Sequence, residues 1–182
     1  EDPPHELSAL ERWRAAGRAW VTTDRDGHPV GFVVVDLVDG TAHIEEISVL
    51  PERNGRGHGM ALMRHVETWA RGKGFPAVTL TTFSEVPWNR PWYERRGYRV
   101  LEEPEWTPGL AQRRAEEAEA GLDPELRVIM AKKMPNSPPG TSRSTCSRSM
   151  RQTLMALAIA ACLVMSVVGG FIPILQGWIF FV

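Results

Sequence analysis

Three glycines within five positions lie between an apolar, β-branched segment and an amphipathic segment. They are Gly55, Gly57 and Gly59, in the stretch SVLPERNGRGHGMAL at residues 48–62. Glycine lets backbone N–H groups approach a ligand with no side chain in the way, at a cost in conformational entropy. A tight strand-to-helix connection would use one or two glycines and would not need a third. The stretch therefore favours a nest of amides at a helix N-terminus, where unpaired donors and the positive end of the helix dipole bind an anionic phosphate.

Two other phosphate-binding loops do not fit this stretch. No Gly-Lys-Ser/Thr follows the glycines, as a P-loop would require. The spacing is Gly-x-Gly-x-Gly rather than the Gly-x-Gly-x-x-Gly of dinucleotide-binding folds. The sequence thus argues against a nucleoside triphosphatase.

The segments around the glycines predict a mixed α/β domain. A meander of antiparallel strands precedes the glycines, and a helix and a buried strand follow them as a β-loop-α-β unit, which makes the sheet parallel at that point. Turn residues and glycine caps set the boundaries of the elements. We expect a short helix ending at Gly17 and further helices at 59–71, 89–97 and 107–121. We expect one strand at 19–24, two strands within 27–50, and further strands at 75–83, 98–103 and 126–134.

Charge and cysteine content divide the chain near Pro135. Residues 1–134 hold 18 Lys and Arg against 22 Asp and Glu, whereas residues 135–182 hold three Arg and no acid. A mildly acidic domain lacks the basic footprint of nucleic-acid binding, so nucleic acid is excluded as a partner. Both cysteines, Cys146 and Cys162, lie in the tail, which leaves the domain without a disulfide or a Cys metal site. A reducing, cytoplasmic compartment and a domain at 1–134 are expected.

The tail is predicted as a Pro/Ser/Arg-rich disordered linker at 135–152 and a hydrophobic segment at 153–182. The stretch 154–175 gives 22 nearly uninterrupted apolar positions, and about 20 suffice to cross a bilayer as a helix. Arginines before it would keep the domain on the cytoplasmic side. A disordered, fused or mistranslated extension explains the same composition, and the sequence leaves both interpretations open.

Two blocks in this order carry a family resemblance. ISVLPERNGRGHGMAL, followed by a helix, a strand and NRPWYERRGY, resembles the GNAT family of acetyl-CoA-dependent N-acetyltransferases over residues 18–133. The family's pyrophosphate loop, Gln/Arg-x-x-Gly-x-Gly/Ala, falls on Asn54, Gly57 and Gly59, with Asn54 in place of the usual Gln or Arg. Its Tyr-Glu-Arg-x-Gly-aromatic block falls on Tyr93, Glu94, Arg95, Gly97 and Tyr98.

The resemblance implies a central mixed sheet with flanking helices and acetyl-CoA as co-substrate, with the family's first strand and helix missing from this chain. Main-chain atoms from Ile47 to Val49 would hold the thioester arm, and Asn89 would either contact the cofactor or cap its helix. His58 and His65 do not form a metal constellation, so no metal is expected. The diphosphate would be held by Asn54, Gly55, Arg56, Gly57, His58, Gly59 and Met60.

The implied reaction is direct acetyl transfer to a primary amine on a small molecule or a peptide. The amine must lose a proton before it attacks, so a carboxylate or an ordered water must accept that proton. Glu45 and Glu46 are the candidates; adjacent strand residues point to opposite faces, which predicts that one of them faces the cleft. His43 is a third candidate, and Tyr93 would protonate the departing thiolate. A non-catalytic coenzyme A sensor or a membrane-tethered interaction module is the alternative, and a homodimer is left open.

Overall fold

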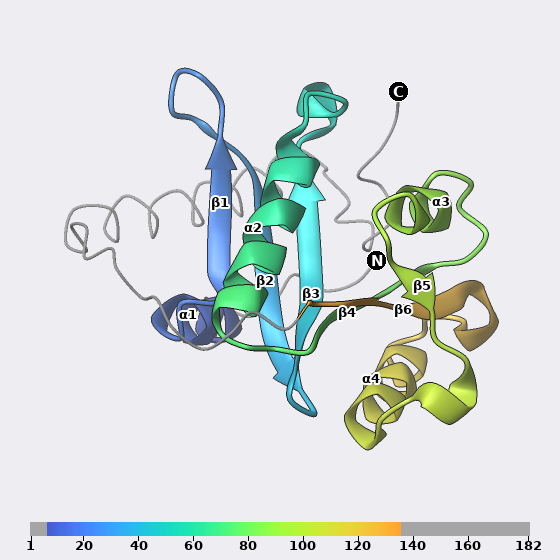
Figure 1. Cartoon of the computed structure of the whole chain (residues 1–182). Helices are drawn as coiled ribbons and strands as arrows, with labels where there is room; N and C mark the ends of the chain where they lie inside the picture. Colours follow the sequence, from blue (N-terminus) through green and yellow to red (C-terminus); the bar gives the residue numbers. More distant parts are fainter. Residues whose placement is uncertain (1–6, 136–182) are drawn as a thin grey trace.

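The structure is a computed structural model that describes residues 7–135 (Figure 1). The predicted order of strands and helices is confirmed, with short 3-10 turns added at Pro51–Arg53, Glu103–Glu105 and Pro124–Leu126. The helices are α1 (Leu7–Ala15), α2 (His58–Gly72), α3 (Asn89–Glu94) and α4 (Pro108–Glu119), and the strands are β1 (Ala19–Thr23), β2 (Pro29–Val38), β3 (Thr41–Val49), β4 (Ala77–Phe83), β5 (Arg99–Val100) and β6 (Arg127–Lys133).

The six strands form one mixed sheet in the order β1-β2-β3-β4-β6-β5. Only β3 and β4 are parallel, as predicted, and they pair through three positions, from Ala42↔Val78 to Ile44↔Leu80. Beyond Ile44 and Leu80 the two strands no longer pair, although β3 runs on to Val49 and β4 to Phe83. We call this separation, between residues 45–49 and 81–83, the notch.

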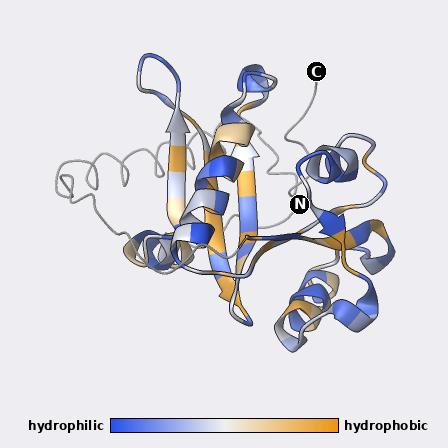
Figure 2. Ribbon diagram, in the orientation of Figure 1, coloured by the Kyte–Doolittle hydropathy of each residue, from blue (hydrophilic) through white to orange (hydrophobic). Residues whose placement is uncertain are grey.

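Helices cover both faces of the sheet. In Figure 1, α2 lies across β1, β2 and β3, and its viewer-facing side is largely hydrophilic in Figure 2. Its buried side packs on β3 and β4 in the main core, to which α3 contributes Trp92 and Tyr93. On the other face, α1 packs against Ala19 and Val34, and α4 packs through Leu110 against Val38 and Ile129.

A β-bulge interrupts β3 at Glu45 and corrects one prediction. Val34 pairs with Glu46 and Val35 with Ile44, so Glu45 is an extra residue in the ladder. After Ile44, the next residue of β3 that enters the core is therefore Ile47, whereas a regular strand would place residue 46 there. The prediction that Glu45 and Glu46 point to opposite faces is wrong, because a bulge suspends the two-residue period of a strand.

Two predictions concern residues that lie outside the range 7–135. The linker from residue 136 onward and the hydrophobic tail at 153–182 lie outside the described residues. Among residues 7–135, no helix has the length and apolar character needed to cross a membrane. The absence of the family's first strand and helix stays a prediction.

Candidate active site

The glycine stretch forms the connection between β3 and α2. Gly55 and Gly57 have φ of 70° and 86°, a left-handed conformation that costs other residues about 1–2 kcal/mol. Gly57 directly precedes α2, and the Ala61 N–H donates to its carbonyl at 2.9 Å to start the helical ladder. The N–H groups of His58, Gly59 and Met60 therefore precede that ladder and are left to bind other acceptors.

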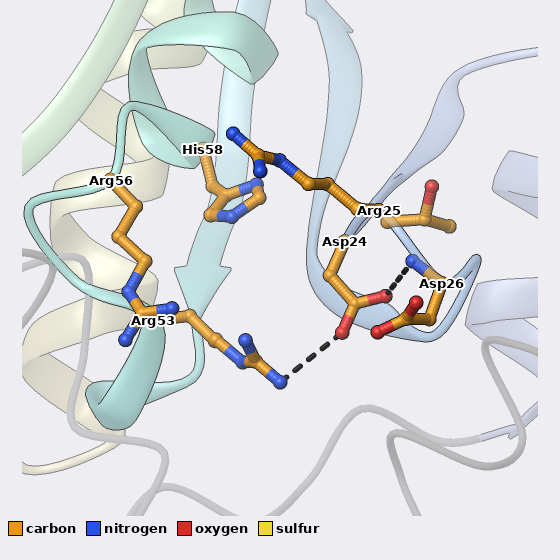
Figure 3. Close-up of a pocket in the computed structure, with 7 residues that line it drawn as sticks. Asp24, Arg25, Asp26, Arg53, Arg56 and His58 are labelled. Carbon is orange, nitrogen blue, oxygen red and sulfur yellow. Dashed lines mark hydrogen bonds and ion pairs between the residues drawn. The ribbon is translucent and has the colours of Figure 1, made fainter.

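A pocket of about 640 Å³ lies between this loop and the tip of the β1–β2 hairpin (Figure 3). Arg53 Nη2 reaches Asp24 Oδ2 at 3.2 Å, and this ion pair fastens the loop to the hairpin. Three arginines against two aspartates give the pocket an excess of positive charge. Thr23, Asp24, Arg25, Asp26, Arg53, Arg56 and His58 line it.

Asp24 organises the hairpin tip. Its Oδ1 accepts bonds from the N–H groups of Asp26 and His28, each at 3.0 Å. Although desolvation opposes ionisation, these bonds and the charge of Arg53 hold the pKa of Asp24 below its usual range.

Asp24, Asp26 and His28 also place possible metal-ligand atoms within 4.8 Å of one another. The turn and the ion pair with Arg53 already account for this grouping.

The side chains of Ile47 and Val49 are buried in the main core. Only their main-chain atoms can therefore face a ligand, and those atoms border the notch. Asn54 is extended, with φ of −61° and ψ of 157°, and its Oδ1 is buried with no hydrogen-bond partner among residues 7–135.

Tyr93 is buried beneath α3. Only 2% of it is exposed, and its ring makes edge contacts with Trp92 and Tyr98 at centroid distances of 4.9 and 5.8 Å. Burial raises the pKa of the phenol far above its ordinary value, so the hydroxyl keeps its proton at neutral pH. The phenol can act as a proton donor and not as a base.

Asn89 does not cap its helix. The cap position is Trp88, whose side chain makes no capping hydrogen bond. Asn89 is 2% exposed, and its Nδ2 has no hydrogen-bond partner in the described part of the chain. The capping interpretation is wrong, and a buried amide donor remains to be explained.

The two candidate carboxylates lie on the same face of the sheet. Glu46 is paired with Val34, which packs under α1, and Glu45 Oε1 accepts a hydrogen bond from Arg113 Nη1 of α4 at 3.0 Å. Arg113 Nη2 also binds Asp36 Oδ2 at 2.5 Å. Glu45 is thus fixed in place by an arginine that lies 68 residues further along the chain.

His43 is a buried neutral side chain. It is 3% exposed, and its Nδ1 lies 2.9 Å from Thr79 Oγ1. Burial, aided by the positive charge of Arg113, lowers the pKa of His43 to about 4. His43 is therefore a weak base, held by Thr79.

Sequence reasoning missed the polar residues that α4, β6 and β4 bring to this face. Arg113, Arg127 and Thr81 carry no motif, and Arg113 and Arg127 find their partners on other elements. The mixture of Arg and Glu in the α4 segment was the only available signal, and it equally describes a solvated helix.

The fold is shared with solved acetyltransferases. A GNAT-family acetyltransferase from Staphylococcus aureus has a TM-score of 0.57 at 13% identity, with 71% of this chain and 76% of that chain covered. The Rv2747 protein of Mycobacterium tuberculosis, solved in complex with CoA, has a TM-score of 0.55 at 19% identity, with 71% and 82% covered. At these identities the likeness concerns the fold alone.

The sequence itself matches the acetyltransferase (GNAT) family over residues 1–98, more than half of the chain. The chain therefore belongs to this family. A mycothiol acetyltransferase of Nocardiopsis dassonvillei is 38% identical over 30% of this chain. The match covers only 19% of that relative's length.

Proposed function

We propose that this protein transfers an acetyl group from acetyl-CoA to an amine. One observation carries the proposal: the amides of His58, Gly59 and Met60 precede the ladder of α2, at the end of β3 where the notch opens. A helix N-terminus with free N–H groups suits a diphosphate. The unpaired strand edges of the notch suit an extended amide-bearing arm such as pantetheine.

Several candidate contacts support acetyl-CoA as the co-substrate. Gly55 and Gly57 shape the loop, and Arg56 and His58 line the positively charged pocket beside it. The main chain from Ile47 to Val49 would pair with the amides of the arm. The buried Nδ2 of Asn89 would gain an acceptor in a carbonyl of the same arm, because an unpaired buried donor is costly.

In the proposed reaction the amine nitrogen attacks the thioester carbon, so a C–N bond forms and the C–S bond breaks. The amine proton passes to Glu45 or Glu46, directly or through water. The thiolate leaves with the proton of the Tyr93 hydroxyl, which burial keeps protonated. No covalent intermediate with the protein is required.

The test uses the full chain, with calorimetry for acetyl-CoA binding and a thiol-release assay with a panel of primary amines. We expect acetyl-CoA to bind and at least one amine to accelerate thiol release. Binding without acceleration by any amine would favour a coenzyme A sensor. A lack of heat on adding acetyl-CoA to folded protein would remove the proposal.

Use of acetyl-CoA places the proposed activity in the cytoplasm. Anchoring by residues 153–182 is a separate proposal, tested by partitioning the full chain between membrane and soluble fractions. Complete recovery of folded protein in the soluble fraction would contradict it.

A further inference from the structure

Two buried arginines share one carboxylate beneath α4. Arg127 Nη2 lies 2.7 Å from Glu117 Oε1, and Arg114 Nη1 lies 3.0 Å from Glu117 Oε2. The side chains of Arg127 and Arg114 are 2% and 7% exposed. The nearby carboxylates Asp36 and Glu45 are bound by Arg113. A buried charge is costly unless it is well paired, and here Arg114 and Arg127 must share the single carboxylate of Glu117.

This sharing leaves one donor of Arg127 unused. Its Nη1 is buried and has no hydrogen-bond partner within residues 7–135. The same holds for the hydroxyl of Thr81, a residue only 1% exposed. Such unpaired buried groups are rare and point to a ligand that the protein itself does not supply.

Thr81 and Arg127 are neighbours on one face of the sheet. The register pairs Thr81 with Ile129 and Phe83 with Arg127, and the Arg127 guanidinium lies 4.7 Å from the centre of the Phe83 ring. Diagonal neighbours in an antiparallel pair are about 7–8 Å apart, within reach of a long side chain. One small anion can therefore contact both residues.

These two groups border the proposed acetyl-transfer site. Thr81 is the first residue of β4 beyond the last β3 pair, Ile44↔Leu80, so it lies at the notch. The charge of Arg127 is also close enough to influence the pKa of Tyr93 and that of His43. The glycine loop begins only after Val49, five residues further along β3, or about 17 Å at the rise of a strand. A diphosphate held by that loop would not reach Arg127.

We propose that the acetyl acceptor carries a carboxylate, which Arg127 Nη1 and Thr81 Oγ1 bind on the α4 face of the notch. This inference rests on the proposed function. A carboxylate supplies two acceptor oxygens for Arg127 Nη1 and Thr81 Oγ1, and its pairing with arginine is among the stronger hydrogen-bonded contacts in proteins. The acceptor class is therefore an amino acid or a related amine with a free carboxylate.

The test compares matched acceptors in the thiol-release assay with the full chain. Each standard L-amino acid is assayed as the free acid and as its α-carboxamide, and each ω-amino acid against the alkylamine of the same length. For the acids that are used, we expect kcat/KM to exceed that of the neutral partner about 10- to 100-fold, as for a hydrogen bond to a charged group.

Variants assign this preference to the two residues. Arg127→Gln should remove the preference for the acid while leaving acetyl-CoA affinity unchanged, and it should fold because Arg114 still pairs with Glu117. Arg127→Lys should restore part of the preference, and Thr81→Val should reduce it several-fold. Arg99→Gln, which removes an exposed arginine of the neighbouring strand β5, is the matched control and should keep the preference.

The outcomes separate this inference from the proposed function. Equal use of acids and neutral partners, or turnover of neutral amines only, would overturn the carboxylate site and leave acetyl transfer intact. An equal loss with both acceptor types in Arg127→Gln would instead assign Arg127 to the thioester. Failure of every carboxylate-bearing amine also overturns the inference, whereas failure to bind acetyl-CoA overturns the proposed function first.

Discussion

The two sides of the notch present different kinds of functional atoms. On the side of β1–β3 and α2, the proposed cofactor contacts are mainly main-chain amides around Gly57 and main-chain atoms of β3, and the candidate bases Glu45 and Glu46 are the exception. On the side of β4–β6, α3 and α4, they are buried side chains such as Tyr93 and Arg127. The first kind of site depends on glycine conformation and should tolerate side-chain exchange. The second depends on the identity of each side chain.

This difference has a consequence for specificity. Main-chain amides recognise a feature common to all coenzyme A thioesters, whereas buried charged side chains select one chemical class of acceptor. The first side should therefore determine cofactor use, and the second should determine which amine is acetylated. Three substitutions can break or sharpen this division and a fourth, at His43, tests the burial of the α4 face; they follow in order of expected effect.

Tyr93→Phe tests whether the second side supplies the chemistry. We expect kcat for thiol release to fall about 1,000-fold, because a positioned proton donor contributes 10²–10⁴ to a rate. Acetyl-CoA affinity by calorimetry should change less than about twofold. Tyr98→Phe is the matched control: its hydroxyl donates to Glu67 at 3.2 Å and has no part in the proposed transfer, so that variant should keep its rate. Equal losses in both variants would contradict the role of Tyr93.

His43 predicts an acid-sensitive stability. Its pKa falls from about 6.5 when unfolded to about 4 when folded, so the unfolded state takes up a proton first as the pH drops. The stability this provides is present above pH 6.5 and is lost between pH 6.5 and 4, up to about 3 kcal/mol. Between pH 6.5 and 4 the free energy of unfolding, measured by urea denaturation, should therefore fall by up to about 3 kcal/mol less in His43→Gln than in the wild-type protein. Identical pH dependence in both proteins would show that His43 is accessible to protons in the folded state.

Gly57→Ala tests the main-chain side. The left-handed φ of 86° disfavours alanine, so the loop amides should turn away from the diphosphate, and the Kd for acetyl-CoA should rise about tenfold. Gly121→Ala is the matched control, since Gly121 has φ of 91°, open space around it and a position after α4. The two variants should lose similar stability. An unchanged Kd in Gly57→Ala would mean that the diphosphate binds elsewhere.

Asp24→Asn should have the smallest effect. It removes the ion pair with Arg53 but keeps an oxygen for the hairpin amides. A single ion pair whose arginine side chain is 35% exposed contributes little, so we expect acetyl-CoA affinity to change about twofold, with the difference disappearing at high salt. A tenfold change would show that the hairpin takes part in binding directly.

The sequence predicted the elements and their order because their signals are local. Glycine spacing marked the start of α2 to within one residue, and the β-loop-α-β arrangement predicted the parallel pairing of β3 with β4. The candidate cofactor residues came from the same local motif. Their roles stay predictions, but the structure places the loop where such a motif requires it.

The remaining features depend on contacts between distant segments. The apolar positions of β3, 42, 44, 47 and 49, lose their two-residue period at Glu45–Glu46, but only the register with β2 identifies the extra residue. Arg113 meets Asp36 across 77 residues, and Arg127 meets Glu117 only because α4 folds back onto the sheet. Asn89 has the composition of a helix cap, yet burial places it inside the first turn instead. Local patterns carry no information about which buried charges will meet.

The two parts of the sheet are joined by the three-position pairing of β3 with β4, a shorter ladder than β2–β3 or β4–β6. Thermal motion can be expected to concentrate there, so the two parts of the sheet should rotate relative to each other about the β3–β4 junction while each part keeps its internal geometry. Amide hydrogen exchange at residues 42–44 and 78–80 would then report this rotation. A thioester bound across the β3–β4 junction would slow the exchange in both strands.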